Sequence, residues 1–150
     1  MTKEDYSLDS HLCFTIYGAH LALKRAYKPL MDALGLTYPQ YLALSLLWEQ
    51  DGRSVGAMSA ALDLEPSTMT PLLKRLEEAG FVVRQRVPSN ERQVRVSLTD
   101  KGRAARGDGK RLMNKLQDVT GLPYEELSQL NKQMQDLRAA VRASLADKGS

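Results

Sequence analysis

Residues 54–98 constrain the fold more than any other part of the chain, because two short helices are followed there by two short strands. Ser54 can cap the first helix, and the second helix runs from about Pro66 to Ala79. One face of this second helix is apolar, and the other carries hydroxyl and basic side chains. The pattern predicts a helix-turn-helix unit that ends at Gly80.

Two strands are predicted next, over residues 81–87 and 93–98, because β-branched residues alternate there in part with polar ones. The turn between them, residues 88–92, is polar and charged. The expected fold class is therefore mainly α with a small β-hairpin wing, a winged helix-turn-helix.

Long helices are predicted on both sides of this unit. Over residues 8–34, apolar side chains recur at steps of three or four. Asp9 or Ser10 can cap the start of this helix, and Gly35 ends it. A further helix, capped by Thr99, is expected to reach about residue 118.

The last predicted helix opens at Pro123 and has a coiled-coil-like apolar seam. The seam consists of Leu127, Leu130, Met134, Leu137 and Val141. It can pack within the subunit, but apolar faces at both ends of the chain favour pairing between two subunits. We therefore expect an N-terminal dimerisation helix (1–36), a DNA-binding domain (37–100) and C-terminal dimerisation helices (101–150).

Composition limits the chemistry that is available. Cys13 is the one cysteine, which excludes an internal disulfide, and with two histidines a Cys/His metal cluster is effectively excluded within one chain. We expect no metal, cofactor or catalytic site. The chain starts with polar residues and has no apolar run near the length of a membrane span, so we expect a cytoplasmic protein without membrane contact.

Basic residues concentrate in the middle of the chain. Residues 66–111 contain eleven Lys or Arg and five Asp or Glu, although the whole chain has a net charge of only +3. Such a basic segment is typical of a module that binds a polyanion. The candidate DNA contacts are Ser67, Thr68, Thr70, Lys74 and Arg75 on the second helix, and Arg84, Arg86, Asn90 and Arg92 on the hairpin.

The run Leu72-Leu73-Lys74-Arg75-Leu76-Glu77-Glu78-Ala79-Gly80-Phe81-Val82 resembles the junction between recognition helix and wing in the MarR family of bacterial transcriptional regulators. Asn90-Glu91-Arg92 and Leu98-Thr99-Asp100-Lys101-Gly102 resemble the wing of that family and the exit from it. The resemblance implies a two-fold homodimer on a pseudo-palindromic double-stranded operator. Asn90 stands where the family usually has Asp, so Arg92 is expected to be held less firmly.

A narrower resemblance is carried by Leu12-Cys13-Phe14-Thr15-Ile16-Tyr17, Tyr27, Leu36-Thr37-Tyr38-Pro39-Gln40-Tyr41 and residues 70–76. These segments are similar to the organic-hydroperoxide-sensing repressors of the OhrR type. That resemblance implies that Cys13 is the redox sensor and that Tyr27 and Tyr38 of the other subunit donate hydrogen bonds to it. Tyr17 matches a further residue of the sensor pocket.

Helix geometry agrees with a site shared between subunits. Cys13 and Tyr27 are fourteen residues apart, so they share a helix face but are separated by about 21 Å along it. They can meet only if a second chain brings them together. We also expect Cys13 near the third or fourth helical position, where the helix dipole stabilises a thiolate.

We therefore predict a dimeric repressor, and not an enzyme, that releases its operator when an organic hydroperoxide oxidises Cys13. A low-molecular-weight thiol is expected as a second effector, because the chain has no second cysteine. One alternative is a MarR-type repressor relieved by a small aromatic or phenolic ligand, with Cys13 inert. The other is a thiol peroxidase.

Overall fold

A computed structural model of the chain describes residues 7–148, which group into two compact units, Met1–Leu112 and Met113–Ser150. The elements are the 3-10 helix η2 (Leu8–Ser10), α1 (Leu12–Leu34), α2 (Tyr38–Glu49), β1 (Arg53–Ser54), α3 (Val55–Leu62), α4 (Pro66–Glu78), β2 (Val82–Val87), β3 (Asn90–Leu98), α5 (Asp100–Ala104), α6 (Arg106–Thr120) and α7 (Tyr124–Lys148). The predicted fold class is confirmed.

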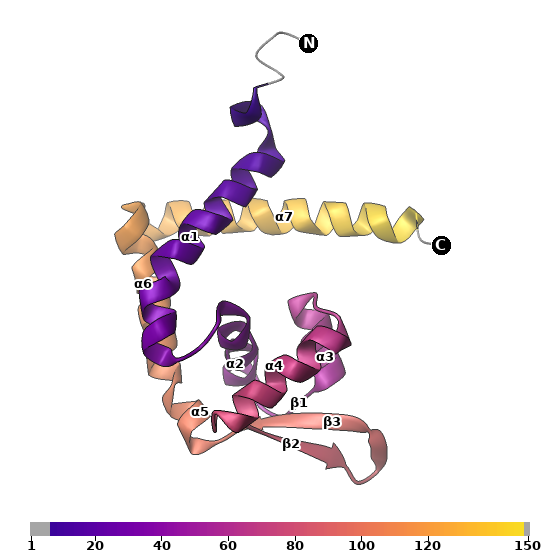
Figure 1. Cartoon of the computed structure of the whole chain (residues 1–150). Helices are drawn as coiled ribbons and strands as arrows, with labels where there is room; N and C mark the ends of the chain where they lie inside the picture. Colours follow the sequence, from indigo (N-terminus) through magenta and orange to yellow (C-terminus); the bar gives the residue numbers. More distant parts are fainter. Residues whose placement is uncertain (1–6, 149–150) are drawn as a thin grey trace. The chain divides into compact units, whose positions relative to one another are not determined.

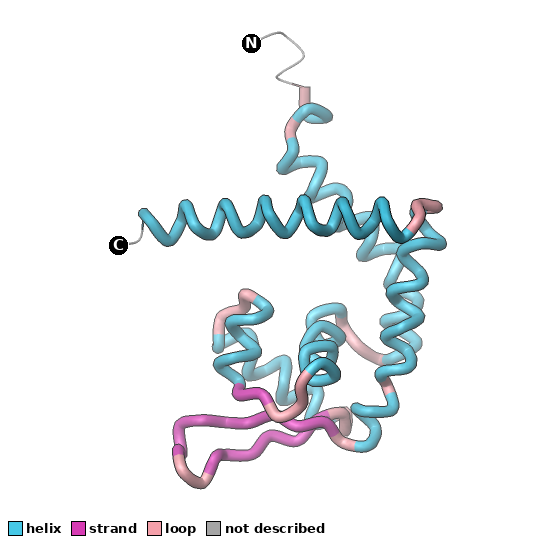
Figure 2. The backbone as a smooth tube through the Cα atoms, turned by 180° about the vertical axis from the view of Figure 1, so that it is seen from behind, coloured by secondary structure: helices cyan, strands magenta, loops and turns pink. Residues whose placement is uncertain are grey.

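The winged helix-turn-helix lies within the first unit. Helices α2, α3 and α4 gather on one side of the β2–β3 hairpin (Figure 1). The sheet is antiparallel with strand order β1-β3-β2, and the hairpin strands run side by side to a short loop (Figure 2). Strand β1 was not predicted, because two residues carry no alternating pattern. It is recognised only by its pairing of Arg53 with Val96.

The core of this domain is dry and built from all its layers. Leu44 of α2, Met58 of α3, Leu73 and Leu76 of α4 and Val96 of β3 each expose essentially none of their surface. Burying side chains of this size stabilises the fold by about 1.5–3 kcal/mol each relative to exposure. Helix α2, with Tyr41, Ala43, Leu44 and Leu47 buried, is therefore a central helix of this core.

Short polar residues fix the helix starts in this unit. Thr37 and Gln40 form a capping box: Thr37 Oγ1 accepts from the Gln40 amide at 3.3 Å, and Gln40 Oε1 accepts from the Thr37 amide at 3.0 Å. Ser54 caps α3 through the Ala57 amide at 3.1 Å. At the end of α1, Gly35 takes a left-handed conformation with φ of 69°, as the sequence predicts.

The start of α1 differs from the expectation. The predicted helix over residues 8–34 is interrupted, because η2 occupies its first residues and extended His11 precedes α1. Asp9 and Ser10 therefore do not cap α1. Pro29 lies inside α1 and has no amide hydrogen to donate to the Arg25 carbonyl, so one hydrogen bond of the helical ladder is missing there.

The single helix predicted from Thr99 is also wrong, since the chain breaks into α5 and α6 at Ala105. Thr99 does cap α5, accepting from the Gly102 amide at 3.1 Å. Gly102 packs so tightly against the backbone just before β2 that a Cβ at this position would lie 2.2 Å from the Phe81 carbonyl oxygen. Its own carbonyl accepts a hydrogen bond from Trp48 Nε1 at 2.8 Å.

The second unit contains α7, which begins after Pro123 as predicted. Leu130 and Val141 of its apolar seam are each about half exposed within the single chain. None of the described helices is long and apolar enough to span a membrane.

Candidate nucleic-acid interface and thiol site

The recognition helix candidate is α4, which has one buried and one exposed face. Met69, Leu72, Leu73 and Leu76 are buried in the core, whereas Ala79, which was predicted in the same stripe, is exposed at the end of the helix. The exposed face carries the predicted DNA contacts Ser67, Thr68, Thr70, Lys74 and Arg75. Their hydroxyl and cationic groups are therefore available on one surface.

The wing presents arginines on its inner face. Cross-strand pairing sets Arg84 opposite Val96 and Arg86 opposite Val94, and paired residues lie on the same side of a sheet. Arg92 is two residues before Val94 and lies on that side too. Strand β3 begins at Asn90, earlier than predicted, and the irregular register between Arg86 and Val87 lies next to the tip.

Asn90 organises the start of β3. Its Oδ1 accepts a hydrogen bond from the backbone amide of Arg92 at 3.2 Å. The amide side chain thus supplies the acceptor expected of the family's aspartate, although without a negative charge. The bond orients the backbone at Arg92 and leaves the guanidinium available to other partners.

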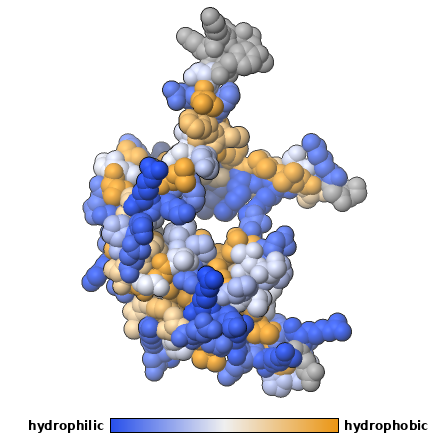
Figure 3. Space-filling view, in the orientation of Figure 1, coloured by the Kyte–Doolittle hydropathy of each residue, from blue (hydrophilic) through white to orange (hydrophobic). Residues whose placement is uncertain are grey.

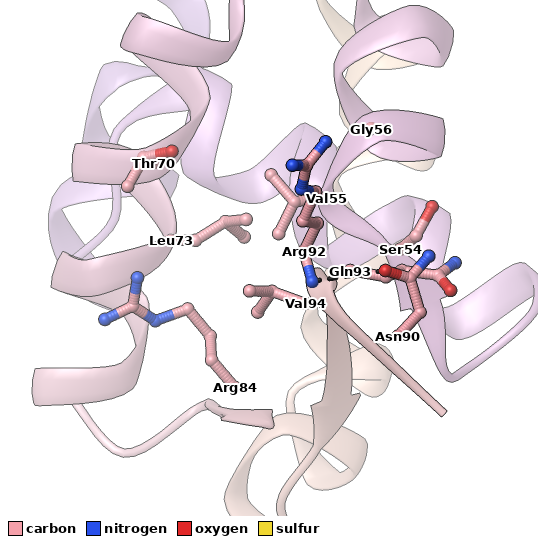
Figure 4. A pocket seen from close by; sticks show the side chains of 10 residues that line it. All are labelled: Ser54, Val55, Gly56, Thr70, Leu73, Arg84, Asn90, Arg92, Gln93 and Val94. Atoms are coloured by element: carbon pink, nitrogen blue, oxygen red, sulfur yellow. Dashed lines mark hydrogen bonds between the residues drawn. The ribbon is translucent and has the colours of Figure 1, made fainter. Parts of the chain in front are cut away.

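A groove lies between the inner face of the wing and the two helices (Figure 4). Its volume is about 530 Å³. The residues that line it are Ser54, Val55, Gly56, Thr70, Leu73, Arg84, Asn90, Arg92, Gln93 and Val94. Arg92 extends along the groove toward Val55 and Gly56, so its cation faces the helix-turn-helix and not the outer side of the sheet.

Arg84 has a different environment from Arg92. Its guanidinium donates to Glu77 Oε1 from Nε at 3.3 Å and from Nη2 at 3.2 Å, and its amide donates to Glu77 Oε2 at 2.8 Å. The backbone hydrogen bond, followed by the side-chain bond and the cation itself, lowers the pKa of Glu77 below its usual value. This carboxylate therefore ties the end of α4 to β2.

The thiol lies on α1, in the same unit. Cys13 is exposed and is the second residue of the helix, one or two positions earlier than expected. Leu12, Phe14 and Tyr17 around it are also exposed, with 56%, 44% and 61% of their surface accessible. Figure 3 shows this apolar surface along the N-terminal part of α1.

The structure brings Tyr27 and Tyr38 together but leaves Cys13 about four turns away from Tyr27 on the same helix. The Tyr27 and Tyr38 ring centroids are 6.4 Å apart. Partial burial, and then the neighbouring tyrosines, raise the pKa of both phenols above the usual value. Both hydroxyls therefore stay protonated around neutral pH and can donate a hydrogen bond to an anion.

Sequence reasoning missed three residues that shape these sites. Trp48 has no role in the sequence analysis, and Glu77 and Gly102 appear there only within the family-like runs. Gly102 is required by close packing, which no local pattern shows. The position of α4 itself was predicted from Pro66 and Gly80, which mark the start and the end of an amphipathic segment.

Helix α4 exposes hydroxyl and basic side chains on one face, and it lies beside a hairpin that carries arginines. This arrangement defines a winged-helix DNA-binding protein. Residues 36–94 match the model of the MarR family. The chain is 44% identical over 137 residues to the HTH-type transcriptional regulator TtmR of Methylorubrum extorquens (strain PA1), covering 91% of this chain and 70% of that protein. The chain belongs to the MarR family of transcriptional regulators, whose members bind DNA as dimers and are not enzymes.

Two other relatives are informative. The organic hydroperoxide resistance transcriptional regulator of Bacillus subtilis (strain 168) is 39% identical over 134 residues, covering 89% of this chain and 86% of that protein. Reduced AbfR bound to DNA, a protein of Staphylococcus epidermidis, is 31% identical with a TM-score of 0.78, covering 97% of this chain and 99% of that one. Disulfide-formed AbfR gives a TM-score of 0.65 at 30% identity, covering 95% of both chains.

Proposed function

We propose that this regulator is a repressor that releases its operator when an organic hydroperoxide oxidises Cys13. The observation that carries the proposal is the pair of protonated phenols, Tyr27 and Tyr38, together with an exposed thiol on the same face of α1 as Tyr27. The 39% identity to a regulator named for organic hydroperoxide resistance supports it. Residues 1–36 would then form a dimerisation helix that carries the sensor cysteine, residues 37–100 would bind DNA, and residues 101–150 would form further dimerisation helices.

The chemistry begins with the Cys13 thiolate. Cys13 is the second residue of α1, where the first helix amides have no partner within the helix. The thiolate sulfur attacks one peroxide oxygen, an S–O bond forms, and the O–O bond breaks. Cys13 becomes a sulfenic acid, and the alkoxide that leaves takes up a proton to give an alcohol. A small thiol can then condense with the sulfenic acid, releasing water and forming a mixed disulfide.

The hydrogen bonds that hold the thiolate come from a second copy of the chain. Cys13 and Tyr27 of one chain are separated by about 21 Å along α1, so the phenol that reaches each thiol belongs to the other subunit. A two-fold axis that sets Cys13 against Tyr27 in both directions passes between the two α1 helices at the level of the residue midway between them. That residue is His20. The exposed apolar residues around Cys13 pack in this contact.

DNA recognition uses the exposed face of α4 in the major groove. Ser67, Thr68 and Thr70 contact phosphates and base edges, and Lys74 and Arg75 contact phosphates or guanine. Arg92, supported by Asn90 and next to Arg86, takes the minor groove. Arg84 acts by positioning the wing through Glu77. Oxidation shifts the dimer helices, so the two α4 helices leave the half-site spacing of about 34 Å.

The direct test titrates operator-bound protein with cumene hydroperoxide and compares the wild type with Cys13→Ser. We expect one equivalent of peroxide per thiol to release the wild type, with the sulfenic acid or mixed disulfide seen by mass spectrometry. The serine variant should stay bound. Equal release of both proteins would refute the thiol switch and favour relief by a phenolic ligand. Continuous peroxide turnover with a thiol reductant would instead indicate a peroxidase.

A cross-linking experiment tests the shared site separately. In a Cys13→Ser background, His20→Cys should form a disulfide between subunits under mild oxidation, because each new thiol faces its own copy across the two-fold axis. Ala22→Cys is the matched control, since Ala22 is also exposed but lies on another face of α1. Efficient cross-linking of Ala22→Cys, and not of His20→Cys, would show that α1 pairs in a different register.

A further inference from the structure

Trp48 belongs to two packed clusters at once. One is the core of the winged helix, which includes Leu44 and Leu73. The other contains Met31 and Tyr41, with Tyr27 and Tyr38 packed against it. Among the described residues, Leu34 also packs against both clusters, but its side chain has no polar atom. Trp48 therefore adds a directional bond where the two clusters meet.

A continuous row of rings leads to Trp48 from the paired phenols. The ring centroids are 6.4 Å apart between Tyr27 and Tyr38, 6.0 Å between Tyr38 and Tyr41, and 5.9 Å between Tyr41 and Trp48. These are contact distances for aromatic pairs. Close-packed rings cannot move independently, so a displacement of Tyr38 must be accommodated by Tyr41 and then by Trp48.

The far side of Trp48 is fixed to the base of the wing. Its Nε1 donates to the Gly102 carbonyl at 2.8 Å. Gly102 is immobilised in turn, because its amide bonds to Thr99 Oγ1 and its Cα packs against the Phe81 carbonyl. Thr99 also donates from Oγ1 to the Gly80 carbonyl at 2.6 Å and from its amide to the Phe81 carbonyl at 3.0 Å. Gly80 and Phe81 are the residues that join α4 to β2.

We propose that Trp48 is the positioning residue that links the state of the thiol site to the wing. The inference rests on the proposed function and names how that site reaches the DNA-binding surface. When Tyr27 and Tyr38 lose their thiolate partner, their rings move, and the displacement passes through Tyr41 to Trp48. Because the indole N–H is bonded to the Gly102 carbonyl, Gly102 then moves together with the base of the wing. Trp48 touches neither DNA nor the thiol, so it acts through other residues.

The first experiment uses Trp48→Phe, which keeps a ring against Tyr41 and removes the donor to Gly102. We expect the Cys13 oxidation rate to stay within about twofold of wild type, and the operator Kd of the reduced protein within about threefold. The rise in Kd on oxidation should shrink at least tenfold. Tyr124→Phe, at an exposed ring on α7, is the control and should behave as wild type. An unchanged rise in Kd for Trp48→Phe overturns the inference.

The second experiment needs no variant of Trp48. It is the one tryptophan of the chain, so intrinsic fluorescence reports on this position alone. Emission should change in proportion to Cys13 oxidation and stay constant in Cys13→Ser. Operator release without any change in emission overturns the coupling, and this result stands even where Trp48→Phe fails to fold.

The two proposals can fail separately. If peroxide does not release wild-type protein from DNA, the proposed function fails. The coupling between the tyrosine row and the wing is then measured by operator affinity alone. Tyr38→Leu, Trp48→Phe and the double variant form a double-mutant cycle. Effects on Kd that deviate from additivity by threefold or more support the coupling, and additive effects overturn it.

Discussion

The winged-helix core and the N-terminal half of α1 differ in how much of their environment one chain supplies. In the core, Leu73 and Leu76 expose none of their surface and are enclosed by helices and sheet from the same chain. On α1, Leu12 and Tyr17 leave more than half of theirs accessible, and Cys13 is exposed between them. One region is complete in a single chain, and the other leaves apolar side chains exposed, as the proposed subunit interface requires.

The largest expected effect compares the same substitution in both regions. Leu73→Ala leaves a cavity in a closed core, so we expect it to lower the free energy of unfolding by about 3 kcal/mol. Leu12→Ala should mainly raise the dimer dissociation constant, because this side chain is 56% exposed in the single chain and lies in the proposed subunit contact. Urea unfolding and sedimentation over a range of protein concentrations separate the two. A large loss of unfolding free energy for Leu12→Ala that does not depend on protein concentration would contradict this difference between the two regions.

A smaller effect is expected at the base of the wing. Gly102→Ala brings a Cβ to 2.2 Å from the Phe81 carbonyl oxygen, which backbone cannot easily relieve. We expect a loss of about 2 kcal/mol and weaker operator binding. The control is Gly107→Ala in α6, where nothing lies within 4 Å of the new Cβ and helix propensity favours alanine. Thermal unfolding measures both, and equal stability of the two variants would contradict the close packing.

The wing arginines test whether the two faces of the hairpin differ. Arg92→Ala should raise the operator Kd about tenfold and reduce the slope of log K against log salt by about one, since one phosphate contact is lost. Arg95 is exposed and donates to the Gly52 carbonyl, and its paired neighbour is Gln85 on the outer face. Arg95→Ala should leave the salt slope unchanged. An unchanged slope for Arg92→Ala would remove the wing from the interface.

The smallest effect concerns the link between α4 and the wing. The folded-state pKa of Glu77 is lowered, so its contribution to stability is present above its usual pKa of 4.5 and is lost as pH falls through the folded value. Glu77→Gln should lower the free energy of unfolding by about 1 kcal/mol at pH 7, which is the upper end for an accessible ion pair. The loss should be smaller at acidic pH. Urea midpoints at both pH values test this. Glu78→Gln, an exposed neighbour, should show no such difference.

The sequence predicted what local patterns determine. Gly35 and Ser54 act within one turn of themselves, so the helix ends that depend on them are placed correctly. The apolar stripe of α4 also predicted its buried face. The candidate DNA contacts lie on the opposite, exposed face of the same helix.

What the sequence missed depends on contacts distant in the chain. Trp48 bonds to Gly102, which is 54 residues away, and the Leu98 amide donates to Asp51 Oδ1 at 2.9 Å across 47 residues. Strand β1 exists only through its pairing with β3. The break at Ala105 was missed because the close contact of Gly102 with Phe81 leaves no trace in helix propensity.

Pro29 has a mechanical consequence for α1. Because the hydrogen bond between residues 25 and 29 is already missing, the helix can bend there without breaking one. Met31, just beyond this point, is buried with Tyr41 and Leu112, whereas Leu12, Cys13 and Tyr17 in the first half of α1 are exposed. The thiol-bearing half of α1 can therefore change its angle to the anchored half at a lower free-energy cost than a fully bonded helix would require.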